Sequence, residues 1–529
     1  MCVVTAKRRY NTRCNLTSHL ADPAQGPPDQ SMRKFCSASD SVKRPKDEAF
    51  FAAMLAAGSL LGGSAIASEP PDPFSTNGLV AASNAGSAGK PLMPSPCDIS
   101  PLGKSPLALA DVVEHALCNN PQTREAWANA RFQAAQVGLS EAAYLPSVAL
   151  GAGETRNWTD GGASAARSSS GSSNYNQLSA TATLSYLLYD FGARDAALEN
   201  AKQILAALNA TQDATLQSVF LAAVQGYYQL FAAQAAVDSA LAAEQSALES
   251  LNAATARHKI GTGTPADKLQ AQTAHSQAVL NRIQAEGNSK SAQGVLANSL
   301  GLDANRAFEI APPAVRMPDA RFDGDVARLI EDARRLRPDV AAAAAQVNAA
   351  KASAEATKAS GMPTVSLATN VNRTHSSSAD PANGAALGVS INFPLFTGYG
   401  TTYRIRAAQE QVETRLAQLE RLRQQVALDV WKAYQGLVTG TQAVSSSTDL
   451  VASASASERV ALGRYKAGVG NILDLLTAQT ALANARLQHI QALYNWYIAK
   501  AALAQAMGQL DFSALESSIP AAAPAKISP

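Results

Sequence analysis

The sequence has few charged residues, and their charges nearly cancel. Of its 529 residues 16% are charged, and the formal net charge is +2. A protein that binds nucleic acid needs a concentrated basic face to neutralise phosphates, so this balance argues against a nucleic-acid partner. Long apolar runs are also scarce, because no stretch outside the N-terminal region is long enough for a transmembrane helix.

The residue patterns of common enzyme and metal sites are missing as well. The six histidines are scattered without an HExxH pair, and the five cysteines form no CxxC, so we expect no metal site. The GTGT stretch at Gly261 lacks the terminal Gly-Lys-Ser/Thr of a phosphate-binding loop. Asp and Glu are spread over helix faces without a paired-carboxylate site. We therefore expect a protein with no enzymatic activity and no cofactor.

The N-terminal region contains the pattern of an export signal. A positive flank at 42–46 precedes an apolar stretch at 49–63 and a small-x-small cleavage site at Ala65-Ile66-Ala67. These features predict a leader over 1–67, and an ordinary N-terminal helix is the alternative interpretation. Because a leader that starts at Met1 is unusually long, we hypothesise that translation starts at Met32.

Most of the cysteines lie in this leader. Export leaves only Cys97 and Cys118 in the mature chain. Two cysteines in an oxidising compartment predict a disulfide, with two unpaired structural thiols as the alternative.

The mature chain is a duplicated unit. Residues 258–274 and 465–481 agree at nine of seventeen positions, 207 residues apart. Nearer the start of each unit, Leu-Pro-Ser-Val at 145–148 matches Met-Pro-Thr-Val at 362–365, now 217 residues apart. The difference falls in the Gly/Ser-rich stretch 161–173, which gives the first unit a longer loop. The resulting divisions are a periplasmic segment at 68–104, a first unit at 105–311, a linker at 312–323, a second unit at 324–511 and a disordered tail at 512–529.

Each unit has the pattern helix, strand, strand, helix, helix. In the first unit these elements are expected at 107–144, about 147–157, about 177–190, 192–258 and 264–300. In the second, the strands are expected at about 364–373 and 386–396, and the last two helices at 401–465 and 471–507. Apolar residues at every second position give each strand one apolar and one polar face. The strand length suits a bilayer, and the small hydroxylated face suits a water-filled lumen, although a soluble half-buried hairpin has the same pattern.

Four strands cannot close a membrane barrel, because the smallest barrels have about eight. An open sheet edge in lipid leaves backbone groups without hydrogen bonds, which costs several kcal/mol for each group. The chain is therefore predicted to oligomerise, as a dimer with about eight strands or a trimer with about twelve.

The duplicated unit, the LPSV/MPTV strand starts and the GxGxxxDxLxAQTA stretch after each turn resemble the TolC family of outer-membrane efflux proteins. The resemblance covers about Leu107 to Leu510, and it implies a mostly helical homotrimer with a membrane β-barrel of about twelve strands and a tunnel of about twelve helices crossing the periplasm. It also implies a Gram-negative outer-membrane location, a periplasmic adaptor protein, and an inner-membrane ABC or proton-driven transporter that supplies the energy.

Within the family, residues 116–146 resemble the CyaE-like, type I secretion branch. This resemblance implies export of a protein such as a haemolysin/adenylate-cyclase-type toxin. The outlet of a multidrug or metal efflux pump needs no different fold. A non-conducting structural trimer is the alternative from another functional class.

The resemblance also assigns residues to the periplasmic entrance. Asp474 falls at an acidic position of the constriction, and Asp267 is its repeat counterpart. The second acidic position of the family, three residues later, is here Thr477. One ring of carboxylates attracts cations more weakly than two. Capping of a helix N-terminus is the alternative role for both aspartates, and the two roles are compatible.

Further candidates lie at the turns and at the ends of the strand hairpins. A pair of glycines marks each helix turn, and the resemblance implies that these turns contact the adaptor: Gly261, Gly263, Gly468 and Gly470. Arg464 and Lys466 flank the second turn and are candidates for pairing with the adaptor, although surface charges often only solvate a face. Tyr189 and Phe396 end the strand hairpins where barrel and tunnel meet, as interface aromatics or as simple packing residues.

Overall fold

The structure, a computed structural model, describes residues 72–80, 106–159, 173–313 and 325–510. The chain divides into two units, and the described residues all belong to the second, which begins at Asp72. The predicted leader, Met32, Cys97, most of the predicted linker and the predicted C-terminal tail lie outside the described residues.

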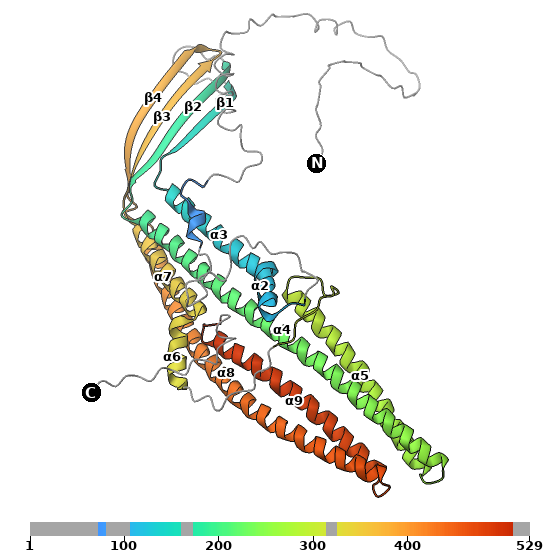
Figure 1. The fold of residues 1–529 in the computed structure, drawn as a ribbon. Helices are drawn as coiled ribbons and strands as arrows, with labels where there is room; N and C mark the ends of the chain where they lie inside the picture. Colours follow the sequence, from blue (N-terminus) through green and yellow to red (C-terminus); the bar gives the residue numbers. More distant parts are fainter. Residues whose placement is uncertain (1–71, 81–105, 160–172, 314–324, 511–529) are drawn as a thin grey trace, which may run out of the picture. The chain divides into compact units, whose positions relative to one another are not determined.

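Each copy of the repeat folds as two short helices, two strands, a very long helix and a returning helix (Figure 1). The first copy comprises α2 (Leu109–Asn119), α3 (Pro121–Ala142), β1 (Ser147–Thr159), β2 (Ser173–Tyr189), α4 (Ala193–Lys259) and α5 (Pro265–Ser299). The second comprises α6 (Val326–Leu336), α7 (Pro338–Ala359), β3 (Thr364–Ser376), β4 (Ala379–Asn392), α8 (Gly400–Lys466) and α9 (Ile472–Ala506). A 3-10 helix, η1 (Thr76–Leu79), packs against α3.

The single helix expected at 107–144 is in fact two, α2 and α3. The break lies at Asn120, whose ψ of 130° is extended rather than helical. Pro121 has no amide N–H to donate to the preceding helix, and its ring disfavours helical backbone in the residue before it. The Asn120 side chain then caps α3 by accepting a hydrogen bond from the Gln122 amide at 2.8 Å. Arg337 and Pro338 repeat the break between α6 and α7.

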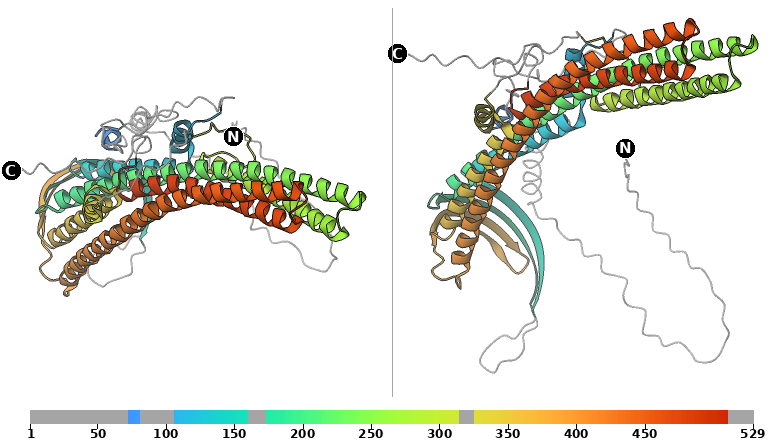
Figure 2. Two further views of the ribbon diagram at one scale, coloured as in Figure 1. Left: turned by 60° about the horizontal axis from the view of Figure 1, so that its bottom comes forward. Right: turned by 90° about the horizontal axis from the view of Figure 1, so that it is seen from below.

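The strands form one antiparallel sheet in the order β1-β2-β3-β4. The pairing of β2 with β3 joins the two repeats, and Figure 2 shows the strands curving together. The prediction for the last strand was wrong at both ends, because β4 runs over Ala379–Asn392 and not over 386–396. Pro394 has no amide N–H to donate to a sheet. The alternation of apolar and polar residues nevertheless continues past Pro394, so the pattern does not indicate where the strand ends. Within the described residues β1 and β4 each pair on one side only, which leaves two open edges per chain.

The long helices run from the sheet to two turns at the opposite end (Figure 1). Helices α4 and α8 have 67 residues each, which at 1.5 Å per residue is about 100 Å. The largest buried cluster joins α2, α4, α5 and α9 around Phe220 and Tyr227. Small residues bring the helices close together: a Cβ on Gly226 of α4 would lie 3.1 Å from Cδ1 of Leu296.

The break between the two short helices contacts the end of the returning helix in both repeats. In the first, Asn120 Nδ2 donates to the Ser299 carbonyl at 3.1 Å. In the second, Arg337 Nη1 donates to the Ala506 carbonyl at 3.4 Å. We call these equivalent contacts the first and second joints.

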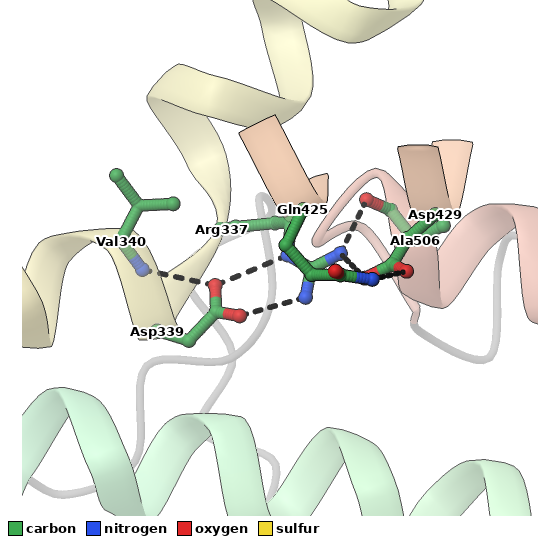
Figure 3. A network of polar contacts seen from close by, with 6 residues as sticks. All are labelled: Arg337, Asp339, Val340, Gln425, Asp429 and Ala506. Carbon is green, nitrogen blue, oxygen red and sulfur yellow. Dashed lines mark hydrogen bonds and ion pairs between the residues drawn. The ribbon is translucent and has the colours of Figure 1, made fainter. Parts of the chain in front are cut away.

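The second joint also carries charge (Figure 3). Arg337 donates to both carboxylate oxygens of Asp339, at 3.1 and 2.7 Å, and lies 3.4 Å from a carboxylate oxygen of Asp429 on α8. Gly508 approaches so closely that an added Cβ would lie 3.0 Å from Cα of Arg337, and its φ of 73° also favours glycine. The joint is therefore tightly packed as well as ion-paired.

Candidate functional site: the hairpin turns and the sheet

The two glycines of each helix turn have different structural roles. Gly261 and Gly468 have positive φ values of 77° and 80°, which the reversal of the backbone requires. Gly263 and Gly470 permit close approach instead. A Cβ on Gly470 would lie 2.9 Å from the Tyr465 amide nitrogen, and one on Gly263 would lie 3.2 Å from the equivalent nitrogen of His258. Both positions of each turn therefore need glycine for a backbone reason.

The two candidate entrance aspartates differ in what holds them. Asp267 belongs to a capping box: its carboxylate accepts from the Thr264 amide at 3.1 Å, and its amide donates to the Thr264 hydroxyl at 3.1 Å. Asn471 caps the second turn, by accepting from the Leu473 amide at 3.2 Å. Asp474 is exposed and forms no hydrogen bond or ion pair with the described residues. Its carboxylate is thus available to solutes or partners, whereas that of Asp267 serves the helix start.

A groove runs between α8 and α9 beside the second turn. Its volume is about 400 Å³, and its lining includes Arg464 of α8, Asp474 of α9 and Gly470 of the turn. The rest of the lining consists of small or apolar residues: Ala456, Ser457, Val460, Ala461 and Ala478. Thr477 lies exposed on α9, one turn beyond Asp474. The groove is thus lined by one positive and one negative side chain among small and apolar residues.

Arg257 links the two hairpins near their turns. Its guanidinium donates to the carbonyls of Tyr465 and Lys466 and lies 4.3 Å from the centre of the Tyr465 ring. Burial raises the pKa of the Tyr465 hydroxyl, with an opposing effect from Arg257 and a reinforcing one from Asp267. Arg257 was not among the predicted site residues, although the repeat places it at the position of Arg464. A second contact between the hairpins joins Gln479 Nε2 to the Ser250 hydroxyl at 3.1 Å.

Aromatic residues gather where the strands meet the long helices. Tyr189 and Phe396, the two aromatics proposed for this junction, are 56% and 77% exposed. Each packs edge-on against a neighbour in the following turn: Tyr189 on Phe191 at 4.8 Å, and Phe396 on Tyr399 at 5.7 Å between ring centres. The role of both residues at the junction stays a prediction.

The remaining candidates concern cysteine and metal chemistry. Cys118 on α2 is disulfide-bonded. Since Cys97 lies outside the described residues, its pairing with Cys118 stays a prediction. Within the described ranges no group of His, Cys, Asp and Glu is placed to hold a metal ion. None of the described helices is long and apolar enough to cross a membrane.

A sequence model of the family described as "Outer membrane efflux protein" matches residues 112–302 and 329–509. The chain belongs to this family. A relative, protein CyaE of Bordetella pertussis, is 31% identical over 420 residues, which cover 78% of this chain and 86% of the relative. Outer membrane protein TolC of Escherichia coli is 22% identical over 440 residues, covering 80% and 87%. The solved outer membrane channel CmeC of Campylobacter jejuni has a similar fold, with a TM-score of 0.69 at 18% identity, covering 84% of this chain and 94% of that one.

Membership settles the class of the protein. It is an outer-membrane channel with a β-barrel and a helical periplasmic tunnel, and members of the TolC family work as homotrimers with an adaptor and an inner-membrane transporter. The predicted TolC-like fold and outer-membrane location are confirmed. TolC-family channels are transport proteins without enzymatic activity.

Proposed function

We propose that this channel is the exit duct of a type I secretion system, with a protein of the haemolysin/adenylate-cyclase type as cargo. The observation that carries the proposal is the pattern of identities: 31% to CyaE, against 24% to the efflux protein BepC of Brucella suis and 22% to TolC. The resemblance of residues 116–146 to the type I branch, which includes α3 and the first joint, points the same way.

The groove between α8 and α9 is the proposed contact for the periplasmic adaptor. Its lining offers Arg464, with which an acidic side chain of the adaptor can pair. Gly470 keeps the turn beside the groove compact, because a Cβ there would lie 2.9 Å from the Tyr465 amide nitrogen. The proposed contact surface for the adaptor also includes Lys466 and the first turn, with Gly261 and Gly263.

The entrance constriction is proposed to carry one effective carboxylate ring, from Asp474. The carboxylate of Asp267 is already bonded within its capping box. The second acidic position of the family, three residues after Asp474, holds the neutral Thr477 here. A single ring gives a weak attractive field for cations, which suits the passage of an unfolded chain with charges of both signs.

A deletion strain tests the cargo directly. Its secreted proteins and its sensitivity to a panel of drugs are measured together, with the wild-type gene supplied in trans as the control. We expect loss of one large secreted protein with unchanged drug sensitivity. Broad sensitisation with intact secretion would instead make the channel the outlet of a drug pump, as the similarity to BepC would then suggest.

A glycine pair tests the adaptor contact. In Gly470→Ala the new Cβ lies 2.9 Å from the Tyr465 amide nitrogen, so the turn must shift. Gly436→Ala is the matched control, since it lies exposed in α8 with nothing within 4 Å of the added Cβ. We expect the first variant to form trimers yet lose co-purification with the adaptor and most secretion, and the control to keep both. Equal behaviour of the two variants would refute the contact.

A further inference from the structure

The two faces of the sheet differ in a way that identifies the lipid side. On one face the paired rows are apolar: Val148 with Leu184, Leu150 with Ala182, and Leu367 with Val389. On the other face the rows are hydroxyl and amide residues, such as Thr183 beside Asn370, whose side chains hydrogen-bond at 3.3 Å. In a membrane barrel the apolar face meets lipid and the polar face lines the lumen.

The apolar face changes character toward the strand ends far from the helices. Arg373 pairs with Ala180 and Asn383, His375 pairs with Leu178, and Arg156 lies further out on β1. Trp158 follows Arg156 on the same face, with the guanidinium 5.4 Å from the ring centre. All of these side chains are exposed. We call Arg156, Trp158, Arg373 and His375 the rim cluster.

The position of the rim cluster across the membrane follows from strand geometry. Tyr189 lies at the inner aromatic junction, and Ala180, the partner of Arg373, is nine residues away on β2. At about 3.3 Å per residue and a tilt of about 40° this corresponds to roughly 23 Å along the membrane normal. The apolar band of an outer-membrane barrel is about 25 Å tall. The rim cluster therefore begins at the level of the outer headgroups, with Trp158 at an interface where tryptophan is enriched.

We propose that the rim cluster binds a lipid of the outer leaflet that carries two separated phosphate groups on its headgroup. Lipid phosphate is the anion available at this height on a lipid-facing surface, and arginine is the side chain best shaped to bind it. Arg156 lies on β1 and Arg373 on β3, two strands apart, and they are offset by four residues along the strand direction. Their backbones are therefore about 16 Å apart. That spacing fits two phosphates on one extended headgroup better than a single phosphate. Glu154, on the same face between them, opposes binding.

The test uses the intact trimer in phosphatidylcholine nanodiscs that contain diphosphoryl lipid A, monophosphoryl lipid A, or neither. Native mass spectrometry of the released trimer counts the retained lipids. We expect preferential retention of the diphosphoryl form, weakened about fivefold by Arg156→Gln or Arg373→Gln alone and about 30-fold by both. Glu154→Gln should strengthen retention, a change of opposite sign that a merely damaged barrel would not produce.

Arg421→Gln is the matched control, because it removes the same charge from an exposed position on α8. Equal retention of the two lipids by the wild type would overturn the proposal, as would a double variant as retentive as Arg421→Gln. If the double variant yields no heat-resistant trimer, a salt titration of the wild type decides: the preference must fall as salt rises. A preference for diphosphoryl lipid that is independent of salt would refute a role for these charges.

Discussion

The second joint allows a prediction whose size follows from its geometry. Arg337→Met keeps most of the side-chain length but removes the paired hydrogen bonds to Asp339, the ion pair with Asp429 and the contact to the Ala506 carbonyl. The Arg337 side chain is only 13% exposed. Burial disfavours its charge, yet the two aspartates together outweigh burial and raise the pKa of Arg337 further.

Breaking a fully buried ion pair by removing one partner costs about 3–5 kcal/mol. The carboxylates here are 30% and 34% exposed, so solvent screens part of the loss. We expect the opening free energy of the joint to fall by about 2–3 kcal/mol. The matched change in the first joint, Asn120→Ala, removes a neutral cap and one carbonyl contact, and about 1–2 kcal/mol is expected there.

Hydrogen exchange of the trimer, read by mass spectrometry, measures this opening locally. Amides at 330–345 and 500–510 should lose protection by about 30- to 150-fold in Arg337→Met, because opening free energy sets their exchange. The turn at 459–471 should not change. In the Arg337→Met background, Asp429→Asn should cost less than it does in the wild type. A loss of protection below about threefold, or independent effects of the two changes, would refute the ion-paired joint.

Two further predictions concern single carboxylates. Burial raises the pKa of Asp213 to about 6, so the folded state binds more protons than the unfolded chain between about pH 4 and 6, and stability should fall as pH rises through that window. Asp213→Asn should remove this slope and stabilise the protein at neutral pH by about 1–2 kcal/mol, because the amide carries no charge whose burial opposes folding. An unchanged pH profile of urea unfolding would contradict this. Asp474→Asn should reduce cation selectivity in a planar bilayer, seen as a shift in single-channel reversal potential, and Asp267→Asn should shift it less because that carboxylate caps α5. A reversal potential unaltered by Asp474→Asn would exclude the ring.

Sequence periodicity was sufficient for the repeat, the order of the elements and the two helix turns, because each depends on local backbone chemistry. It failed where one residue overrides a pattern. Pro121 divides an otherwise continuous helical pattern, and Pro394 ends β4 inside an uninterrupted alternation. The link from Arg257 to Tyr465 joins residues 208 positions apart, and no local signal reports such a contact. The sequence holds one clue to this contact, because the two copies of the repeat have arginine at the equivalent positions 257 and 464.

The duplication explains why equivalent positions can differ in function. The turn from strand to long helix needs two residues of positive φ, and the copies place glycine and an aromatic in opposite order: Phe191-Gly192 in the first and Gly398-Tyr399 in the second. An aromatic residue in this conformation costs about 1–2 kcal/mol. Both rings pack edge-on against an earlier aromatic residue, Phe191 on Tyr189 and Tyr399 on Phe396. The helix turns show the same freedom. Asn471 caps the second turn as Thr264 and Asp267 cap the first, and this substitution releases the carboxylate of Asp474 from the backbone. The second copy keeps the fold because a different residue caps the same backbone position. The carboxylate of Asp474 is then not needed for the cap.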